Sequence, residues 1–246
     1  INIDKIKYEK AESSSDKIQN KKFNIFYGED HELFRQSLRN FINGYSKEKI
    51  DTFLKNIDSQ RNFFKNLFEM GYFGFEGRSK ADGFNFDSLQ GLILNQEIAK
   101  VKSSQFSAIN YNFQITQDYI SRLGNQKQKD TYLLSDKGKV LIGCNATFEN
   151  FDYKDLSSIK TTAKRKGDYY LINGSKKIIS SGINSDYFII SCKISNEKQN
   201  NGLSLFIIPK LLNGADITKK LNSKDFNADY KAIYFDNLKV PAENLL

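Results

Sequence analysis

The sequence is poor in the residue types that most often carry special chemistry. Its 246 residues include no Trp, one Met, one His, two Pro and two Cys. Cys144 and Cys192 have 47 residues between them, and no CxxC pair or Cys/His cluster accompanies either one. We therefore predict no metal site, and we expect both thiols to be reduced side chains of the core.

Long apolar runs and runs of one charge are also missing. The longest apolar stretches, 187–192 and 203–209, are too short to span a bilayer, and no signal-peptide pattern is visible. The formal charge of +8 comes from 37 basic and 29 acidic side chains that are interleaved along the chain. This pattern indicates a solvated surface of mixed charge, so we predict neither a membrane span nor a nucleic-acid partner.

Two isolated polar residues have ordinary explanations. His31 lies near the start of a predicted helix among acidic neighbours, and no Ser or Cys partner indicates a catalytic triad. We interpret it as a solvated residue of the first helical turn. Glu97 falls in another predicted helix, and a surface or capping role is expected for it.

The first half of the chain has helical periodicity. Residues 1–24 are polar and aperiodic, which predicts an N-terminal arm. Apolar residues then recur at helical spacing, and Asp87 stands where it can cap one of the helices. This predicts an all-α domain over 25–138, with helices near 33–42, 50–57, 63–68, 89–98, 106–123 and 126–134.

The second half, 139–246, has the composition and spacing typical of β-strands. Short stretches rich in Ile, Val, Phe, Tyr and Thr alternate with Gly, Asn and Asp, and Lys166-Gly167-Asp168 suits a hairpin turn. The fold class predicted is therefore α+β with two domains, the second an antiparallel β-barrel or sandwich. The strands are expected near 140–148, 160–164, 169–172, 187–193, 203–209 and 232–235.

Four stretches, in order, resemble the acyl-CoA dehydrogenase family. Residues 122–133 are similar to the family's "YGTEEQKQKYLP", and 138–149 to "SGEWIGAFALTEP". Residues 170–186 resemble "YVLNGxKxWITNGxxAD", and 235–246 resemble "FDDVRVPxENLLG". The order and spacing of the four are those of the family, so the resemblance covers most of the chain.

The resemblance implies an FAD-dependent flavoprotein that removes hydrogen from Cα and Cβ of an acyl-CoA thioester. It implies electron-transfer flavoprotein as the electron acceptor, a possible homo-oligomer, and a location in the bacterial cytoplasm or the mitochondrial matrix. In such a family the catalytic Glu belongs to a further helical domain, which would follow Leu246, so this chain lacks it. We predict no catalytic residue here, and periodicity aims none of the carboxylates of Glu69, Asp118 and Asp130 at a thioester.

The sequence departs from the family where the flavin is expected. Glu149 matches the Glu of "TEPxAGSD", but Phe148 stands at its Thr and Lys154 at its Ser. Thr147 could supply the hydroxyl only if the strand slipped by one residue, which would turn its side chain to the other face. Ile178 stands where the family has an aromatic residue over the ring. Ser180 keeps a hydroxyl where the family has Thr, and an ordinary strand serine is an equal alternative for it. The positions at which the resemblance implies flavin contacts are thus Thr147, Phe148, Lys154, Ile178 and Ser180.

Given these departures, three hypotheses about the function remain. In the first, the chain is part of a working flavoenzyme. In the second, the flavin site has decayed and the scaffold serves as a binding or structural protein. In the third, ranked last, a basic two-domain protein binds an anionic polymer. We expect the isolated chain to bind FAD weakly or not at all and to catalyse no dehydrogenation.

Overall fold

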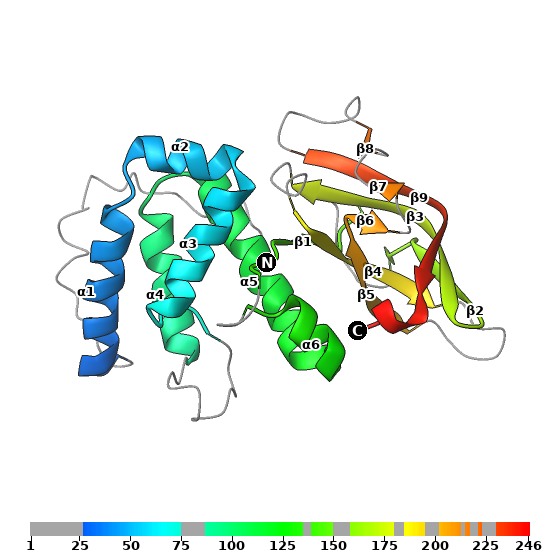
Figure 1. Cartoon of the computed structure of the whole chain (residues 1–246), viewed down its shortest axis with the longest axis horizontal. Helices are drawn as coiled ribbons and strands as arrows, with labels where there is room; N and C mark the ends of the chain where they lie inside the picture. The colour runs from blue at the N-terminus through cyan, green and yellow to red at the C-terminus, as the bar shows by residue number, and fades with distance from the viewer. Residues whose placement is uncertain are drawn as a thin grey trace, which may run out of the picture.

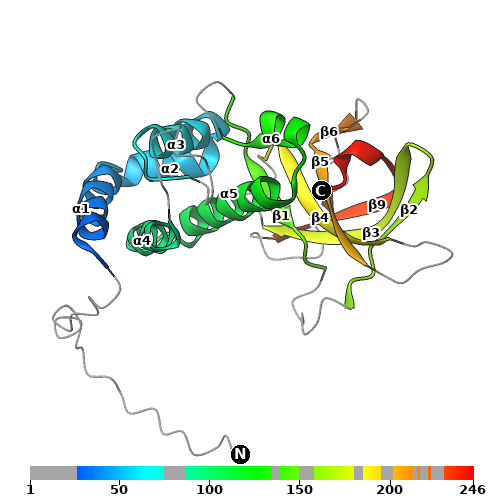
Figure 2. The same cartoon turned by 90° about the horizontal axis from the view of Figure 1, so that it is seen from below.

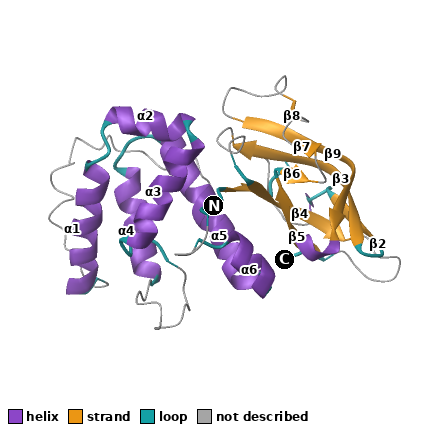
Figure 3. Ribbon diagram, viewed as in Figure 1, coloured by secondary structure: helices purple, strands orange, loops and turns teal. Residues whose placement is uncertain are grey.

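The part of the chain that the computed structural model describes comprises residues 27–74, 87–134, 139–149, 158–179, 185–194, 202–212, 215–216, 221–222 and 230–246. Here a bundle of helices is followed by a curled sheet, purple and orange in Figure 3. This confirms the predicted fold class. The predicted arm and the predicted boundary at residue 138 lie outside the described residues, so both stay predictions.

Each of the six predicted helices has a counterpart in the described chain (Figure 1). They are α1 (Glu29–Asn43), α2 (Lys47–Lys55), α3 (Ile57–Glu69), α4 (Ser88–Ala99), α5 (Ser104–Leu123) and α6 (Gln126–Tyr132).

Local capping explains where several of these helices begin. Asp87 precedes α4 and accepts a hydrogen bond from the backbone N–H of Gln90 at 2.8 Å, while Gln90 Oε1 accepts from the N–H of Asp87 at 2.9 Å. Asn125 and Gln128 make the same reciprocal pair at the start of α6. These contacts satisfy backbone donors that the first turn of a helix leaves without partners.

The core of the helical half is built largely from phenylalanine. Phe64 of α3 and Phe113 of α5 stack with their ring centroids 3.8 Å apart and their planes at 13°. Most of the other close ring pairs there are edge-on or tilted, which suits the quadrupoles of aromatic rings. The fully buried rings are Phe53, Phe63, Phe64, Phe106 and Phe113.

In its described residues, the second half is a seven-stranded sheet with a separate pair of short strands. The sheet follows the order β1-β4-β2-β3-β9-β8, with β5 also paired to β4, and β6 pairs with β7. Gly167, with φ of 63°, makes the predicted hairpin turn between β2 and β3. The strands are β1 (Gly143–Ala146), β2 (Thr162–Lys166), β3 (Tyr169–Ile179), β4 (Tyr187–Ile194), β5 (Leu203–Pro209), β6 (Leu211–Leu212), β7 (Ala215–Asp216), β8 (Leu221–Asn222) and β9 (Tyr230–Pro241), followed by the 3-10 turn η7 (Ala242–Asn244).

The sheet is mixed rather than antiparallel throughout, which corrects the prediction in this respect. Both β1 and β2 run parallel to β4. Because β5 occupies one edge of β4 along its length, β1 and β2 share the other edge, one after the other. Ala146 at the end of β1 is opposite Ile190, and Thr162 at the start of β2 is opposite Lys193. The chain thus leaves this edge after β1 and rejoins it a short distance further along.

Helix α5 lies between helices α1–α4 and the sheet, against β1 (Figure 2). Gly143 permits this approach, because a Cβ there would lie 2.3 Å from Thr116 Oγ1. The buried side chain of Gln117 donates to Tyr187 Oη at 3.0 Å, and Asn112 Oδ1 accepts from the N–H of Asn145 at 3.0 Å. These buried hydrogen bonds fix how the helices meet the sheet.

Candidate functional site at the end of strand β1

The structure describes two of the five predicted flavin contacts in full. Thr147 and Phe148 follow β1 directly; Thr147 is half-buried, whereas Phe148 exposes 47% of its surface. Phe148 therefore faces outward more than Thr147 does, and the assignment of both to a flavin stays a prediction. Ile178 lies in β3, which contacts β1, but its side chain is outside the described part. Lys154 and Ser180 also lie outside the described residues.

A buried lysine occupies the inner side of this segment. The side chain of Lys176, from β3, has no exposed surface. Its Nζ lies 2.8 Å from Glu149 Oε1, 3.0 Å from Ser191 Oγ and 3.3 Å from the carbonyl oxygen of Thr147. Ser191 Oγ in turn donates to the same carbonyl at 2.8 Å. Three acceptors match the three N–H donors of a protonated lysine, so the geometry is that of an ammonium group.

The Glu149 carboxylate links the two ends of the stretch between β1 and β2. Its Oε2 accepts from the backbone N–H of Lys160 at 2.7 Å, and its Oε1 accepts from the backbone N–H of Thr161 at 2.8 Å. The Thr161 hydroxyl adds a third bond at 2.5 Å. One side chain at the start of the stretch therefore holds the backbone at its end.

The electrostatics of this pair follow from its burial and its hydrogen bonds. Burial alone would raise the pKa of Glu149, but hydrogen bonds from Lys176, from the Thr161 hydroxyl and from the two backbone N–H groups outweigh it and lower the pKa to about 2. Burial lowers the pKa of Lys176, and the hydrogen bond to Glu149 acts against that shift. The carboxylate is thus firmly ionised at neutral pH.

Gly174 makes room for this network. Its φ of 139° lies in the region that favours glycine, and a Cβ there would lie 2.7 Å from Cα of Thr161. The Asn173-Gly174 pair of the family-like motif therefore brings β3 close to the end of the stretch.

Lys176 was not among the predicted site residues, although the strand pattern around it carries a signal. Tyr170 and Ile172 of β3 are buried, and alternation along a strand puts residue 176 on the same face. A lysine on a buried face requires partners, and Glu149 was the acidic residue already aligned with the family motif.

The carboxylates considered as alternative bases are paired elsewhere. Glu69 lies 3.5 Å from Lys65, and Asp118 lies 2.7 Å from Nε of Arg122. Asp130 accepts from Gln126 at 2.7 Å. None of the three takes part in the described hydrogen bonds around Thr147 and Glu149.

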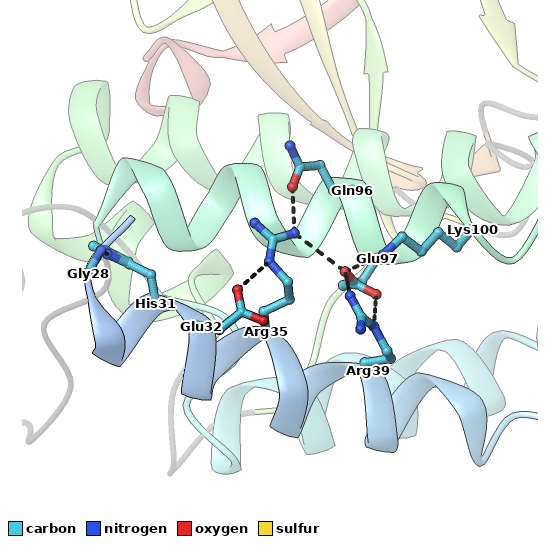
Figure 4. A network of polar contacts seen from close by, with 8 residues as sticks. All are labelled: Gly28, His31, Glu32, Arg35, Arg39, Gln96, Glu97 and Lys100. Carbon is cyan, nitrogen blue, oxygen red and sulfur yellow. Dashed lines mark hydrogen bonds and ion pairs between the residues drawn. The ribbon is translucent and has the colours of Figure 1, made fainter. Parts of the chain in front are cut away.

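A second buried carboxylate lies in the helical half, far from these residues along the chain (Figure 4). Glu97 of α4 exposes 1% of its side chain, so the surface or capping role expected for it is wrong. Arg39 of α1 binds both oxygens at 3.0 Å, and Lys100 lies at 2.7 Å. Arg35 Nη1 lies 3.5 Å from Oε1 and donates to Gln96 at 2.7 Å. This network joins α1 to α4.

His31 lies in the first turn of α1, as predicted, but it is not simply solvated. Its Nδ1 accepts from the N–H of Gly28 at 3.1 Å (both residues appear in Figure 4), and its Nε2 lies 2.9 Å from Asp87 Oδ2. With Nδ1 accepting, the proton of the neutral ring is on Nε2, which donates to Asp87. The histidine therefore ties the start of α1 to the start of α4.

A cavity of about 370 Å³ lies between α4 and α5. Polar groups on its wall pair with one another: Asn95 Nδ2 with Gln114 Oε1 at 3.2 Å, and Asp118 with Arg122. Its lining comprises Phe73, Gly74, Asp87, Ser88, Gly91, Asn95, Tyr111, Gln114, Ile115, Asp118 and Arg122.

Within the described ranges, no three His, Cys, Asp or Glu side chains are placed to hold a metal ion. No helix in that same part of the chain is long and apolar enough to cross a membrane.

Comparison with known proteins gives a consistent result. Residues 28–135 match the family described as "Acyl-CoA dehydrogenase, N-terminal domain", and residues 149–238 match "Acyl-CoA dehydrogenase, middle domain". The mitochondrial short-chain specific acyl-CoA dehydrogenase of Mus musculus is 25% identical over 89% of this chain and 53% of its own length. The short-chain specific enzyme of Clostridium acetobutylicum is 28% identical over 88% of this chain and 58% of its own.

Solved structures share the fold. An acyl-CoA dehydrogenase from Bacillus anthracis, complexed with FAD, superposes with a TM-score of 0.67 at 22% identity, over 90% of this chain and 38% of that one. The chain spans about half the length of the curated relatives it matches.

Proposed function

Because the chain belongs to the acyl-CoA dehydrogenase family, we propose that it forms the helical and β domains of a flavoprotein that oxidises acyl-CoA thioesters between Cα and Cβ. The observation that carries this proposal is the match of two family domains, in the family's order, over 28–135 and 149–238. The backbone at the end of β1 also supports the proposal. Hydrogen bonds from Lys176 and Ser191 hold it in place at the position where the flavin is expected.

Two features of the described residues support FAD binding at the end of β1. Lys176 and Ser191 hold the backbone of Thr147 from the inner side, while Phe148 is exposed on the other side. A fixed backbone beside an exposed aromatic ring suits a flat aromatic group such as the isoalloxazine. FAD, when bound, supplies the acceptor for the hydride that leaves Cβ. The residues proposed to hold it are Thr147, Phe148, Lys154, Ile178 and Ser180.

The base that removes the α-proton is proposed to lie outside this chain. Proton abstraction requires a base within hydrogen-bond reach of the substrate. Glu69, Asp118 and Asp130 are paired within their own helices. The family resemblance places the base in a third, helical domain. An acyl-CoA substrate and an electron-transfer flavoprotein as electron acceptor are part of the same proposal, as is a homo-oligomer.

One observation favours a second candidate function, that of a decayed homologue with a binding or structural role. Phe148 has no hydroxyl to offer a flavin, and its exposed ring stands where the family has Thr. In that case the Lys176 network would hold the scaffold together without serving a cofactor.

A chimera separates the two candidates. The chain is joined to the third domain of the Clostridium acetobutylicum relative and purified, and its flavin absorbance and oxidation of a short-chain acyl-CoA are measured with an artificial electron acceptor. Flavin and turnover in the chimera, with neither in the chain alone, support the flavoenzyme. A folded chimera without flavin refutes it and supports the decayed homologue.

A further inference from the structure

The stretch between β1 and β2 leaves and rejoins one edge of β4 within a short distance. Its ends lie opposite Ile190 and Lys193 of β4, three residues apart. The stretch runs from residue 147 to residue 161, and bringing its two ends this close together costs conformational entropy. Some interaction therefore has to hold the two ends together.

Two kinds of contact hold these ends. At the first end, the carbonyl of Thr147 accepts from Lys176 and Ser191, which belong to β3 and β4. Across the gap, the Glu149 carboxylate accepts from the backbone N–H groups of Lys160 and Thr161. Lys176 takes part in both, because its ammonium group contacts the Thr147 carbonyl and the carboxylate.

Removing the Lys176 ammonium would weaken both contacts. The Thr147 carbonyl would keep only the Ser191 hydroxyl among its described donors. The Glu149 side chain, 10% exposed, would become a largely buried carboxylate without its counterion, and such groups draw in water or rearrange. Packing alone does not require the Lys176 ammonium group to contact three acceptors, so these contacts indicate an electrostatic role.

We propose that Lys176 is a positioning residue: its buried ammonium group fixes the backbone that leaves β1 and, through Glu149, closes the stretch that follows. Resting on the proposed function, this names the group that presents Thr147 and Phe148 to the flavin in one geometry. Lys176 itself need not touch the cofactor.

Amide hydrogen exchange followed by NMR tests the proposal on the chain itself. The N–H groups of Lys160 and Thr161 report directly on the closure, because both donate to Glu149. The amide of Ile189, in the middle of β4, reports on the stability of the sheet. The variants are Lys176→Met, Ser191→Ala and, as a matched control on the exposed face of β2, Lys164→Met.

In Lys176→Met, the amides of Lys160 and Thr161 should exchange at least tenfold faster relative to Ile189 than in the wild type. Ser191→Ala should show a smaller acceleration at the same two amides, and Lys164→Met none. Equal acceleration at all three amides of Lys176→Met would mean that the lysine only stabilises the domain, and it would overturn the proposal. No acceleration would overturn it as well.

If Lys176→Met does not fold, Lys176→Gln takes its place, because it removes the charge, keeps a polar end and leaves Glu149, the acceptor of both amides, intact. The same local acceleration supports the proposal, and wild-type protection of Lys160 and Thr161 overturns it. The flavin is addressed separately in the chimera that carries the third domain, by flavin absorbance after purification. A folded wild-type chimera without flavin would count against the proposed function, while the exchange rates measured on the chain itself still decide the role of Lys176.

Discussion

Replacing Glu97 by Gln tests how much of the stability of the helical half depends on one buried carboxylate. Burial alone would raise the pKa of Glu97, but hydrogen bonds and charge interactions with Arg39 and Lys100 lower it from 4.5 to about 2. Such a shift corresponds to about 3 kcal/mol in favour of the ionised, folded state. Glu97 exposes only 1% of its side chain, but Arg39 and Lys100 expose 42% and 56% of theirs, so screening by water makes this figure an upper bound.

The sign of the pH dependence follows from the lowered pKa. The stabilisation is complete above about pH 4.5, the ordinary pKa of the unfolded carboxyl group, and is lost as the pH falls towards 2. At pH 7 we expect Glu97→Gln to lower the free energy of unfolding by up to about 3 kcal/mol. At pH 2 to 3 the difference should shrink towards zero, since the protonated acid resembles the amide.

Urea unfolding followed by the helical circular dichroism signal, at several pH values, measures this difference. Glu69→Gln is the matched control, because Glu69 is 54% exposed and lies 3.5 Å from Lys65. Exposed pairs of this kind contribute about 0–1 kcal/mol. Equal stability of Glu97→Gln and wild type at pH 7, or a difference that persists unchanged in acid, would refute the reasoning.

Three further predictions concern the β half and the cofactor. Gly174→Ala should lower the free energy of unfolding by about 2–4 kcal/mol in urea titrations, because the φ of residue 174 disfavours a side chain and the alanine Cβ would meet Thr161. In the control Gly202→Ala, where the space is open, the free energy of unfolding should change by no more than about 0.5 kcal/mol. Burial raises the pKa of both Cys144 and Cys192 to about 12, so neither should react with a thiol reagent at pH 8 until the protein unfolds, and fast reaction in the folded state would contradict this. After gel filtration the isolated chain should carry flavin well below one equivalent by absorbance and show no acyl-CoA turnover; near-stoichiometric flavin would show that the departures from the family motif are tolerated.

The interactions that the sequence predicted correctly are short in range. Asp87 bonds to a backbone group three residues away, and the hairpin turn at Gly167 needs only the conformational freedom of that one residue. The helices and strands follow from the spacing of apolar residues along each segment. Such features depend on neighbours in the chain, so the order of elements was predictable.

The interactions that the sequence did not predict join distant segments. Glu97 meets Arg39, 58 residues earlier, and nothing in the spacing of α4 indicates that partner. His31 meets Asp87 across 56 residues. Each residue has an ordinary surface explanation until its partner's helix is placed beside it.

The candidate site divides in the same way. Its proposed place after β1, with Thr147 and Phe148, follows from the sequence motif. The parallel pairing of β1 and β2 with one edge of β4 was not, because strand spacing does not specify which edges meet. Nor was the burial of Lys176, which is tolerable only because Glu149 and Ser191 arrive from other segments to accept its hydrogen bonds. The sequence by itself determined the helices, the longer strands, their order and the family, but not the two-residue strands β6, β7 and β8. The tertiary structure alone decided which charges could be buried, since a buried charge is stable only where distant segments supply its partners.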